Sequence, residues 1–276
     1  MPELPEVEII KRDLSSILIS KKIKSTFVGN KKLKRIIPQL SVLNDSTILN
    51  IFRRNKYLIL QTNNSWLVIH LGMTGKLIFL PSMPKNFPKH THAWIQFNDG
   101  SYLYYDDPRR FGSIDLFSIN QYPNYLTIPL FLNLGIEPLS LDFKFNKFSS
   151  CFNNSRKIKS FLMDSSVVCG IGNIYASEIL FLAKIHPERL VHTISLDEQK
   201  KLFHFIPLVL EKSIELGGSS ISDFVHTNGL KGSMQNFYNV YGLNHQPCKV
   251  CSTPIEKVMI AGRSSFFCPS CQKMNC

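Results

Sequence analysis

Long apolar runs are absent from this sequence of 276 residues. The best one, residues 66–71, has the length of a strand, whereas a helix that spans a membrane requires roughly 20 apolar residues. The first residues, Met-Pro-Glu-Leu-Pro-Glu-Val-Glu, are acidic and lack the basic and then apolar pattern of a secretory signal. Internal repeats and low-complexity tracts are missing as well. We therefore expect a soluble protein that is not exported.

Acidic residues are scarce relative to basic ones, with 20 Asp and Glu against 32 Lys and Arg and a formal net charge of +12. Residues 21–35 hold seven basic residues and no acidic one. Such charge can simply be solvated, but an excess spread over the whole chain also attracts a polyanion, and we expect a nucleic acid. Because hydrophobic residues make up 44% of the chain, a core can be buried and global disorder is excluded.

The seven cysteines fall into two groups. Cys151, Cys169 and Cys276 are isolated, and no role is predicted for them. The other four form two Cys-x2-Cys pairs that are sixteen residues apart: Cys248, Cys251, Cys268 and Cys271. This spacing is typical of a zinc ribbon, in which two knuckles joined by a hairpin place four thiolates around one structural Zn²⁺. Two disulfides are the alternative, which the reducing compartment of an unexported protein disfavours.

The first half of the chain predicts a helix followed by short strands. Val7, Ile10 and Leu14 recur at helical spacing, and Pro5 suits a first helical turn. Five strands are expected at residues 47–52, 57–62, 66–71, 93–97 and 101–105. Asn98-Asp99-Gly100, between the last two, is a strong hairpin signal. Short strands at this spacing predict a sandwich or barrel-like layer that ends near residue 132.

After residue 132 the pattern becomes helical. Residues 173–184 predict one helix, and Ser195-Leu-Asp-Glu198 is a capping box that opens another, which should end at Gly217-Gly218. Pro207 inside this helix predicts a kink or a break. A short helix is expected at 222–225, before a loop at 227–236. The expected fold is α+β and multidomain: an N-terminal β-sandwich with a leading helix (1–132), a helical domain (133–236) and a zinc-ribbon hairpin (237–276).

Pro2 and Glu3 are the first candidates for chemistry. A small second residue usually allows the initiator Met to be removed, which would leave the Pro2 nitrogen as a free secondary amine beside Glu3. An α-amine has a pKa of about 8, against about 10.4 for Lys, so ~10% of it is neutral at pH 7. Such an amine can attack a sugar aldehyde carbon and form an iminium, as a catalytic lysine would. Taken alone, an ordinary chain start is the commoner alternative.

Three further motifs place cations or apolar side chains on turns. Arg53-Arg54-Asn55-Lys56 precedes a predicted strand, and its cations are either solvated or directed into a site. His70-Leu-Gly-Met-Thr-Gly75 and Asp107-Pro-Arg-Arg-Phe-Gly112 are turns bounded by glycine. Ordinary turns are the alternative, but apolar wedges on such turns unstack base steps, and Arg and Phe can fill the space of an extruded base. Arg263, in the polar tip of the zinc hairpin, suits a phosphate or a reacting group.

In combination, these motifs resemble the bacterial formamidopyrimidine-DNA glycosylases, the base-excision enzymes for oxidised guanine. The matching segments run in order along nearly the whole chain: 2–8, 56–58, 70–75, 107–112, 162–164, 170–178, 186–187, 240–242 and the four cysteines. The resemblance implies a monomeric, bifunctional glycosylase and abasic-site lyase that acts on duplex DNA containing oxidised bases. It also implies a helix-two-turns-helix motif in the central domain and a place in the bacterial cytoplasm, associated with the nucleoid.

The resemblance also implies the roles of individual residues. Pro2 would attack C1′ of the damaged nucleotide, Glu3 would act as general acid and base, and Lys56 would assist proton transfer at the adjacent phosphate. Arg263 would complete a phosphate clamp and donate a proton in the later elimination. The remaining site residues would bind DNA: His70, Met73, His90, Arg109, Phe111, Asn154, Lys159 and Asn173.

Among these, His70 and Asn173 would hold phosphates, whereas Met73, Arg109 and Phe111 would enter the duplex, with Arg109 facing the orphaned cytosine. The lesion loop of the family would correspond to residues 229–236. Asn154 stands where relatives often carry a basic residue, and Ser160-Phe161 replaces the Pro-Trp of some relatives.

Two alternatives remain on the same scaffold. One is an enzyme of the endonuclease VIII type, which prefers oxidised pyrimidines; Leu4 argues against it, because those relatives typically have Pro-Glu-Gly-Pro at their start. The other is a non-catalytic binder of damaged DNA. The presence of Pro2, Glu3 and Lys56 together argues against that alternative, because binding alone does not require a terminal imino acid.

Overall fold

The computed structural model describes residues 2–220, 227 and 229–274. The chain divides into two compact units, of which the first comprises Met1–Leu132 with Leu216–Gln235 and the second comprises Asn133–Glu215 with Asn236–Cys276. This division differs from the three expected domains, because residues 216–235 belong to the first unit and the zinc hairpin belongs to the second. The three-domain division stays a prediction. Within the described part of the chain, every helix is too short or too polar to span a bilayer.

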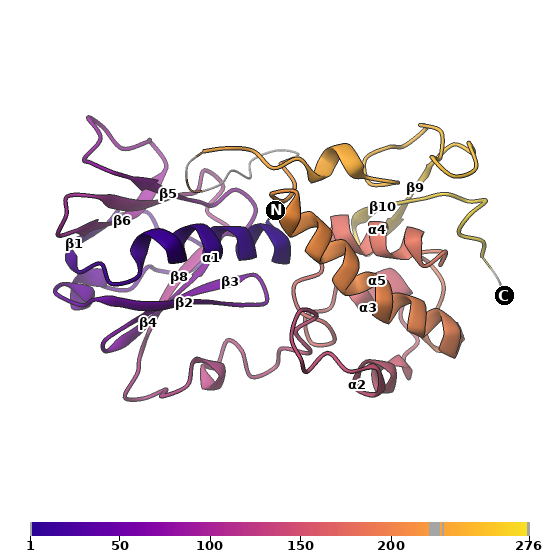
Figure 1. The fold of residues 1–276 in the computed structure, drawn as a ribbon, viewed down its shortest axis with the longest axis horizontal. Helices are drawn as coiled ribbons and strands as arrows, with labels where there is room; N and C mark the ends of the chain where they lie inside the picture. The colour runs from indigo at the N-terminus through magenta and orange to yellow at the C-terminus, as the bar shows by residue number, and fades with distance from the viewer. Residues whose placement is uncertain (1, 221–226, 228, 275–276) are drawn as a thin grey trace. The chain divides into compact units, whose positions relative to one another are not determined.

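The first unit is a β-sandwich with a leading helix, α1 (Leu4–Leu18), which lies along strands β2 and β3 (Figure 1). Both of its sheets are antiparallel and four-stranded. The first sheet has the order β1 (Ile23–Val28), β6 (Thr91–Phe97), β7 (Tyr102–Asp106) and β5 (Lys76–Leu80). The second sheet has the order β2 (Ile48–Arg54), β3 (Tyr57–Thr62), β4 (Ser65–His70) and β8 (Ser113–Ser118). The predicted sandwich is therefore confirmed.

The core of the first unit lies between the two sheets. Leu67 and Ile69 of β4 and Ile95 and Leu103 of the other sheet line one internal cavity of about 20 Å³. The cavity is small and its lining is mostly apolar, so the inner faces of the two sheets pack closely. Side chains alternate across each strand, so Leu103 is buried in this core, whereas its neighbour Tyr104 is directed to the other face.

All five predicted strands are present, and β3 has the predicted bounds. The sequence pattern missed three strands, β1, β5 and β8, and each of them is an edge strand of its sheet. An edge strand can carry polar and charged side chains, so its alternation is weak. In β1, Ile23 is the one buried residue, and the strand lies inside the basic stretch of residues 21–35.

The second unit contains the helices α2 (Phe145–Ser149), α3 (Ile158–Leu162), α4 (Asn173–Leu182) and α5 (Leu196–Glu215). The predicted capping box opens α5: Ser195 N donates to Glu198 Oε2 at 2.9 Å, and Glu198 N donates to Ser195 Oγ at 3.3 Å. The helix continues through Pro207, so the break offered as one outcome there does not occur. It ends before Gly217, whose φ of 75° is the left-handed conformation that favours glycine. The helix expected at 222–225 lies outside the described residues.

The zinc hairpin is formed by β9 (Glu256–Ile260) and β10 (Arg263–Phe267), which pair antiparallel. Ala261 and Gly262 form its two-residue turn, and both have positive φ, which suits the twist of a tight hairpin. The cysteine end of the hairpin packs on Phe181 of α4.

A buried carboxylate fastens the segment before this hairpin to α4. Glu178 is 1% exposed, and its oxygens accept the backbone N–H groups of Asn239 at 2.8 Å, Val240 at 3.0 Å and Tyr241 at 2.9 Å. Because three consecutive backbone N–H groups donate to one buried side chain, this segment is held firmly against α4.

Candidate active site and zinc centre

The start of the chain is held by the first turn of α1. Pro2 is buried, and Glu3, the N-cap residue, is 2% exposed. Glu6, three residues later, completes a capping box: its Oε2 accepts Glu3 N at 2.8 Å, and its Oε1 accepts Ser219 N at 2.8 Å. One carboxylate that is 1% exposed therefore fixes both Glu3 and the segment after α5. The sequence reasoning did not single out Glu6, although an acidic residue three positions after an N-cap is a capping signal.

Lys56 lies in the two-residue turn that joins β2 to β3. Its neighbour Asn55 has a φ of 56°, a left-handed conformation that Asn tolerates better than most residues. Lys56 is 9% exposed and Asn55 is 6% exposed, so the turn is packed into the protein. Because the turn is buried, Lys56 has a defined position. A lysine that was merely solvated at the end of a strand would not have one.

His70, at the end of β4, is a neutral hydrogen-bond donor. Burial first, and then the positive charges of Lys56, Lys34 and Arg35, lower its pKa from 6.5 to about 4. The backbone N–H of Gly72 donates to His70 Nδ1 at 3.1 Å, so the ring hydrogen must be on Nε2. This geometry suits donation of an N–H to an anion such as a phosphate oxygen.

The turns of residues 71–75 and 107–112 are locked together by Asp107, which is fully buried. Its Oδ1 accepts Thr74 Oγ1 and its Oδ2 accepts Gly112 N at 2.9 Å, while Arg109 N donates to Thr74 Oγ1 at 3.2 Å. The two backbones also touch: a Cβ at Gly72 would lie 2.5 Å from Gly112 N. The tight fit explains the glycines of both motifs.

These locked turns present three of the predicted DNA-binding side chains together. Met73 is 37% exposed and Phe111 is 48% exposed, and Arg109 is exposed as well. The Arg109 guanidinium lies 4.9 Å from the centre of the Phe111 ring. His90 is exposed beside the same turns, and its carbonyl accepts Asp107 N at 3.1 Å. Exposed apolar and cationic side chains on a rigid base are what insertion into a duplex requires.

In the second unit, three predicted residues meet at the zinc hairpin. Arg263 is exposed at the start of β10. The carbonyl of the next residue, Ser264, accepts Asn173 Nδ2 at 2.9 Å and Lys159 Nζ at 3.1 Å. Lys159 is 1% exposed and also donates to Ser265 Oγ at 2.8 Å. Both side chains thus hold the strand that carries Arg263, and their contacts with DNA stay a prediction.

Asn154 takes part in a local turn. Its Oδ1 accepts Arg156 N at 2.8 Å and Arg156 Nε at 3.1 Å, which is the Asx-turn arrangement common in loops. The predicted DNA contact of Asn154 also stays a prediction.

The four hairpin cysteines have the geometry of a zinc centre. Their Sγ atoms all lie within 4.8 Å of one another, with Cys251 at 3.4 Å from Cys268 and 3.5 Å from Cys271. A disulfide requires about 2.0 Å, whereas thiolates at about 2.3 Å from a tetrahedral zinc are roughly 3.8 Å apart. The N–H groups of Val250 and Cys271 donate to cysteine sulfurs, which favours thiolates. Four protein ligands leave no position open for water, so the zinc is structural. Cys276, unexplained by the sequence, lies outside the described residues.

The predicted residues therefore form two sets, one in each compact unit. The first unit holds Pro2 and Glu3 at the start of α1 and gathers Met73, Arg109 and Phe111 on the locked turns. The second unit gathers the hairpin residues.

Three family models match the chain. Residues 1–114 match the N-terminal domain of formamidopyrimidine-DNA glycosylase, residues 134–225 match its H2TH domain, and residues 246–273 match a zinc finger found in FPG and IleRS. The match of the central domain confirms the helix-two-turns-helix prediction.

Similar proteins cover nearly the whole chain. A formamidopyrimidine-DNA glycosylase from Legionella pneumophila (strain Philadelphia 1) is 43% identical over 275 residues, which cover 99% of this chain and 98% of the relative. Fpg from Lactococcus lactis in complex with DNA containing an abasic site has a TM-score of 0.88 and 35% identity, covering 98% of this chain and 99% of the other. Fpg of the same organism with DNA containing an oxidised pyrimidine has a TM-score of 0.88 and 36% identity, covering 99% and 100%.

Replacing one cysteine ligand should abolish zinc binding. We expect about one zinc per chain in the unsubstituted protein and almost none in Cys268→Ser, whose hairpin should lose its order because zinc coordination contributes folding energy directly. Zinc content by a colorimetric chelator and Tm by calorimetry measure both effects. Cys151→Ser, outside the cluster, is the matched control and should keep its zinc. A Cys268→Ser variant with full zinc content and an unchanged Tm would contradict the assignment.

The low pKa of His70 should appear in the acid stability of the protein. The folded state disfavours protonated His70, so the stability due to the neutral ring is complete above pH 6.5 and is lost as the pH falls toward 4. Between pH 7 and 4, we expect the unsubstituted protein to lose on the order of 2 to 3 kcal/mol more unfolding free energy than His70→Gln. Guanidinium unfolding at both pH values measures this difference. The exposed His204, substituted as His204→Gln, is the control; equal losses in all three proteins would show that His70 is not the cause.

Proposed function

Because the chain belongs to the formamidopyrimidine-DNA glycosylase family, we propose that it removes oxidised purines, such as 8-oxoguanine and formamidopyrimidines, from duplex DNA and then cleaves the abasic site. The observation that carries this proposal is the start of α1, where Glu6 holds Glu3 beside Pro2 in a buried position. The relatives come from bacteria. We propose that this protein likewise acts in the bacterial cytoplasm, associated with the nucleoid.

The first chemical stage is base removal. With Met1 removed, the Pro2 nitrogen forms a bond to C1′ as the bond between C1′ and the damaged base breaks and the base leaves with a proton. Lys56 contacts the phosphate next to the lesion and assists this proton transfer. Glu3 takes the proton from the Pro2 nitrogen and then gives it to O4′ as the sugar ring opens, which leaves an iminium between Pro2 and C1′. The buried carboxylate of Glu3 suits both steps, because a general acid and base must lie within hydrogen-bond reach of the reacting atoms.

The second stage is strand cleavage. The iminium withdraws electrons from C2′, which loses a proton to the base Glu3 while the bond from C3′ to its phosphate oxygen breaks. In a second elimination C4′ loses a proton and the bond from C5′ to its phosphate oxygen breaks, and water then releases the sugar fragment from Pro2. Arg263 donates a proton in this later elimination; its exposed position at the turn of a fixed hairpin supports this role.

DNA binding relies on phosphates and on distortion of the duplex. A base inside a duplex cannot be reached, so the target nucleotide must be extruded. Met73 and Phe111 fill the vacated space and Arg109 faces the orphaned cytosine, while His70, His90, Asn154, Lys159 and Asn173 bind the DNA. Phosphate contacts carry no sequence information, which suits damage that arises at any sequence.

An enzyme of the endonuclease VIII type is the alternative function. A relative from Lactococcus lactis has been solved with DNA containing an oxidised pyrimidine, so binding alone does not separate the two functions. In single-turnover assays, we expect excision of 8-oxoguanine opposite cytosine to be at least about 10-fold faster than excision of an oxidised pyrimidine, a difference of about 1.4 kcal/mol in the barrier. The reverse preference would favour the alternative. Absence of any borohydride-trapped complex would favour a non-catalytic binder.

Pro2→Gly should separate chemistry from binding. Glycine keeps a terminal amine but makes it primary and more mobile, so excision should fall by about two orders of magnitude, while affinity for the lesion changes little. Protein that retains Met1 should be as impaired, because the Pro2 nitrogen is then in a peptide bond. Pro123→Gly, in an exposed loop of the same unit, is the matched control and should keep full activity. Full activity of Pro2→Gly would rule out Pro2 as the nucleophile.

A further inference from the structure

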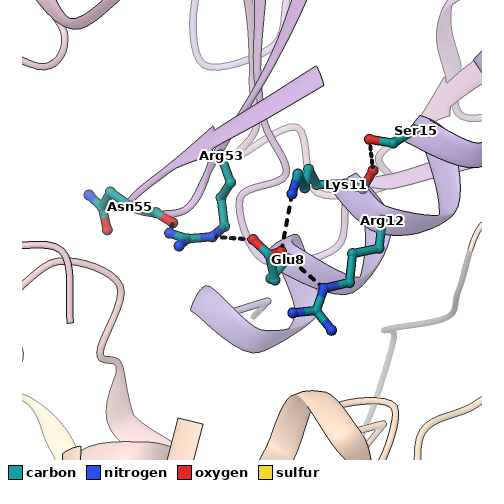
Figure 2. Close-up of polar contacts among 6 residues, drawn as sticks. All are labelled: Glu8, Lys11, Arg12, Ser15, Arg53 and Asn55. Carbon is teal, nitrogen blue, oxygen red and sulfur yellow. Dashed lines mark hydrogen bonds and ion pairs between the residues drawn. The ribbon is translucent and has the colours of Figure 1, made fainter. Parts of the chain in front are cut away.

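Glu8 connects the first helix to strand β2. Its carboxylate, in a side chain that is 12% exposed, accepts Arg53 Nε on Oε2 at 3.0 Å and Arg12 Nε on Oε1 at 3.1 Å. Lys11 Nζ lies 3.3 Å from Oε1. Figure 2 shows Glu8 at the centre of these three cations, with Lys11 and Arg12 on its own helix and Arg53 on the neighbouring strand. Of these three contacts, the one with Arg53 joins α1 to another element, strand β2.

The guanidinium of Arg53 also reaches the turn that carries Lys56. Arg53 Nη1 donates to the carbonyl oxygen of Asn55 at 3.0 Å, as Figure 2 shows. That carbonyl belongs to the peptide group between Asn55 and Lys56. Because a peptide group is planar, a fixed direction of this carbonyl also fixes the direction of the Lys56 N–H and the position of its Cα. Two hydrogen bonds therefore link the carboxylate of Glu8 to the peptide group next to Lys56.

Burial gives this link a fixed geometry. The side chain of Arg53 is 8% exposed, whereas that of Arg12 is 62% exposed. Burial by itself raises the pKa of Glu8, but the charges and hydrogen bonds of Arg53, Lys11 and Arg12 outweigh it and hold the pKa below its usual value. Glu8 is thus ionised at neutral pH. An ionised carboxylate and the rigid planar fork of arginine form directional hydrogen bonds, whereas an exposed ion pair is loose.

We propose that Glu8 and Arg53 are positioning residues that hold Lys56 in register with the start of α1, where Pro2 and Glu3 lie. The inference rests on the function proposed above for Pro2 and Lys56. It adds a requirement that this function does not contain: base removal depends on a largely buried ion pair whose members touch neither the base nor the sugar. Through Glu8, a displacement of α1 moves the peptide group next to Lys56 with it.

The two chemical stages should respond differently to loss of this link. Base removal uses Lys56, and a misplacement of about 1 Å in a reacting group can cost about 100-fold in rate. Trapping of Pro2 at a preformed abasic site requires the amine and the sugar aldehyde, and it does not require departure of a base. A displaced Lys56 should therefore slow excision and leave trapping nearly unchanged.

The experiment compares Arg53→Gln with the matched control Arg12→Gln. Arg12→Gln removes another cation from the same carboxylate but leaves the link to the turn intact. Single-turnover excision of 8-oxoguanine with saturating enzyme, and borohydride trapping at a preformed abasic site, are measured for both variants. We expect Arg53→Gln to slow excision by about 10- to 100-fold with trapping within about threefold, because only the first stage depends on the position of Lys56. Arg12→Gln should stay within about twofold in both assays, because exposed ion pairs contribute little.

Arg53→Lys keeps the test informative if Arg53→Gln folds poorly. A lysine can pair with Glu8 and preserve the Tm, but a single ammonium cannot reproduce the two-armed contact with Glu8 and Asn55. We expect slow excision at a nearly unchanged Tm. Glu8→Gln and the double variant Glu8→Gln with Arg53→Gln complete a cycle, in which the double variant should be no slower than the slower single variant.

The outcomes separate the inference from the function on which it rests. If the unsubstituted protein neither excises 8-oxoguanine nor is trapped, the proposed function fails. If it does both, but Arg53→Gln and Arg53→Lys excise at the unsubstituted rate, the positioning inference alone is overturned. A parallel fall in excision, trapping and Tm would also overturn it, because the pair would then be only structural.

Discussion

A buried carboxylate at the first turn of α1 is the constraint on which the proposed chemistry depends. Chain ends are usually poorly ordered, because they are tied down on one side only. Here Glu6 accepts N–H groups from both Glu3 and Ser219, and α1 is anchored by apolar residues such as Leu4 and Leu14, which are fully buried. A nucleophile at such a position can be rigid and still carry a free amine.

Buried polar groups also hold candidate functional segments in place elsewhere in the chain. Exposed side chains that would meet DNA are carried by turns, and buried polar groups hold those turns in place. Asp107 locks the turns that present Met73 and Phe111, and Lys159 holds the strand that presents Arg263. Loops normally carry function on a rigid scaffold, and here hydrogen bonds to buried groups extend the rigidity of the scaffold to the loop itself.

Much of the fold could be predicted from the sequence because its signals are local. The apolar spacing of α1, the Asn98-Asp99-Gly100 hairpin, the capping box at Ser195 and the cysteine spacing each depend on a few neighbouring residues. The three strands that the pattern missed are edge strands, where solvent on one side permits residues such as Lys24 and Lys76. The break offered at Pro207 did not occur, because tertiary packing stabilises a helix whose Leu202, Ile206 and Leu210 are buried.

The sequence predicted roles for candidate residues such as Pro2, Lys56 and Arg263, but it predicted no role for the buried residues that hold their surroundings in place. Glu8 and Glu178 also lie in segments that match the family, at residues 2–8 and 170–178, but neither segment indicates which residues these carboxylates contact. Their partners are far away in the sequence: Arg53 is 45 residues from Glu8, and Val240 is 62 residues from Glu178. Only the folded chain brings such partners together, so no local pattern could have indicated them.

The position of the covalent bond to the sugar tests the central claim most directly. Borohydride reduction of the reaction with abasic DNA, nuclease trimming, trypsin digestion and mass spectrometry locate the modified residue. The account predicts an adduct on the peptide of residues 2–11, which begins at Pro2, with ordinary cleavage after Lys56. An adduct on Lys56, which would block that cleavage, or full activity in protein shown to retain Met1, would contradict it.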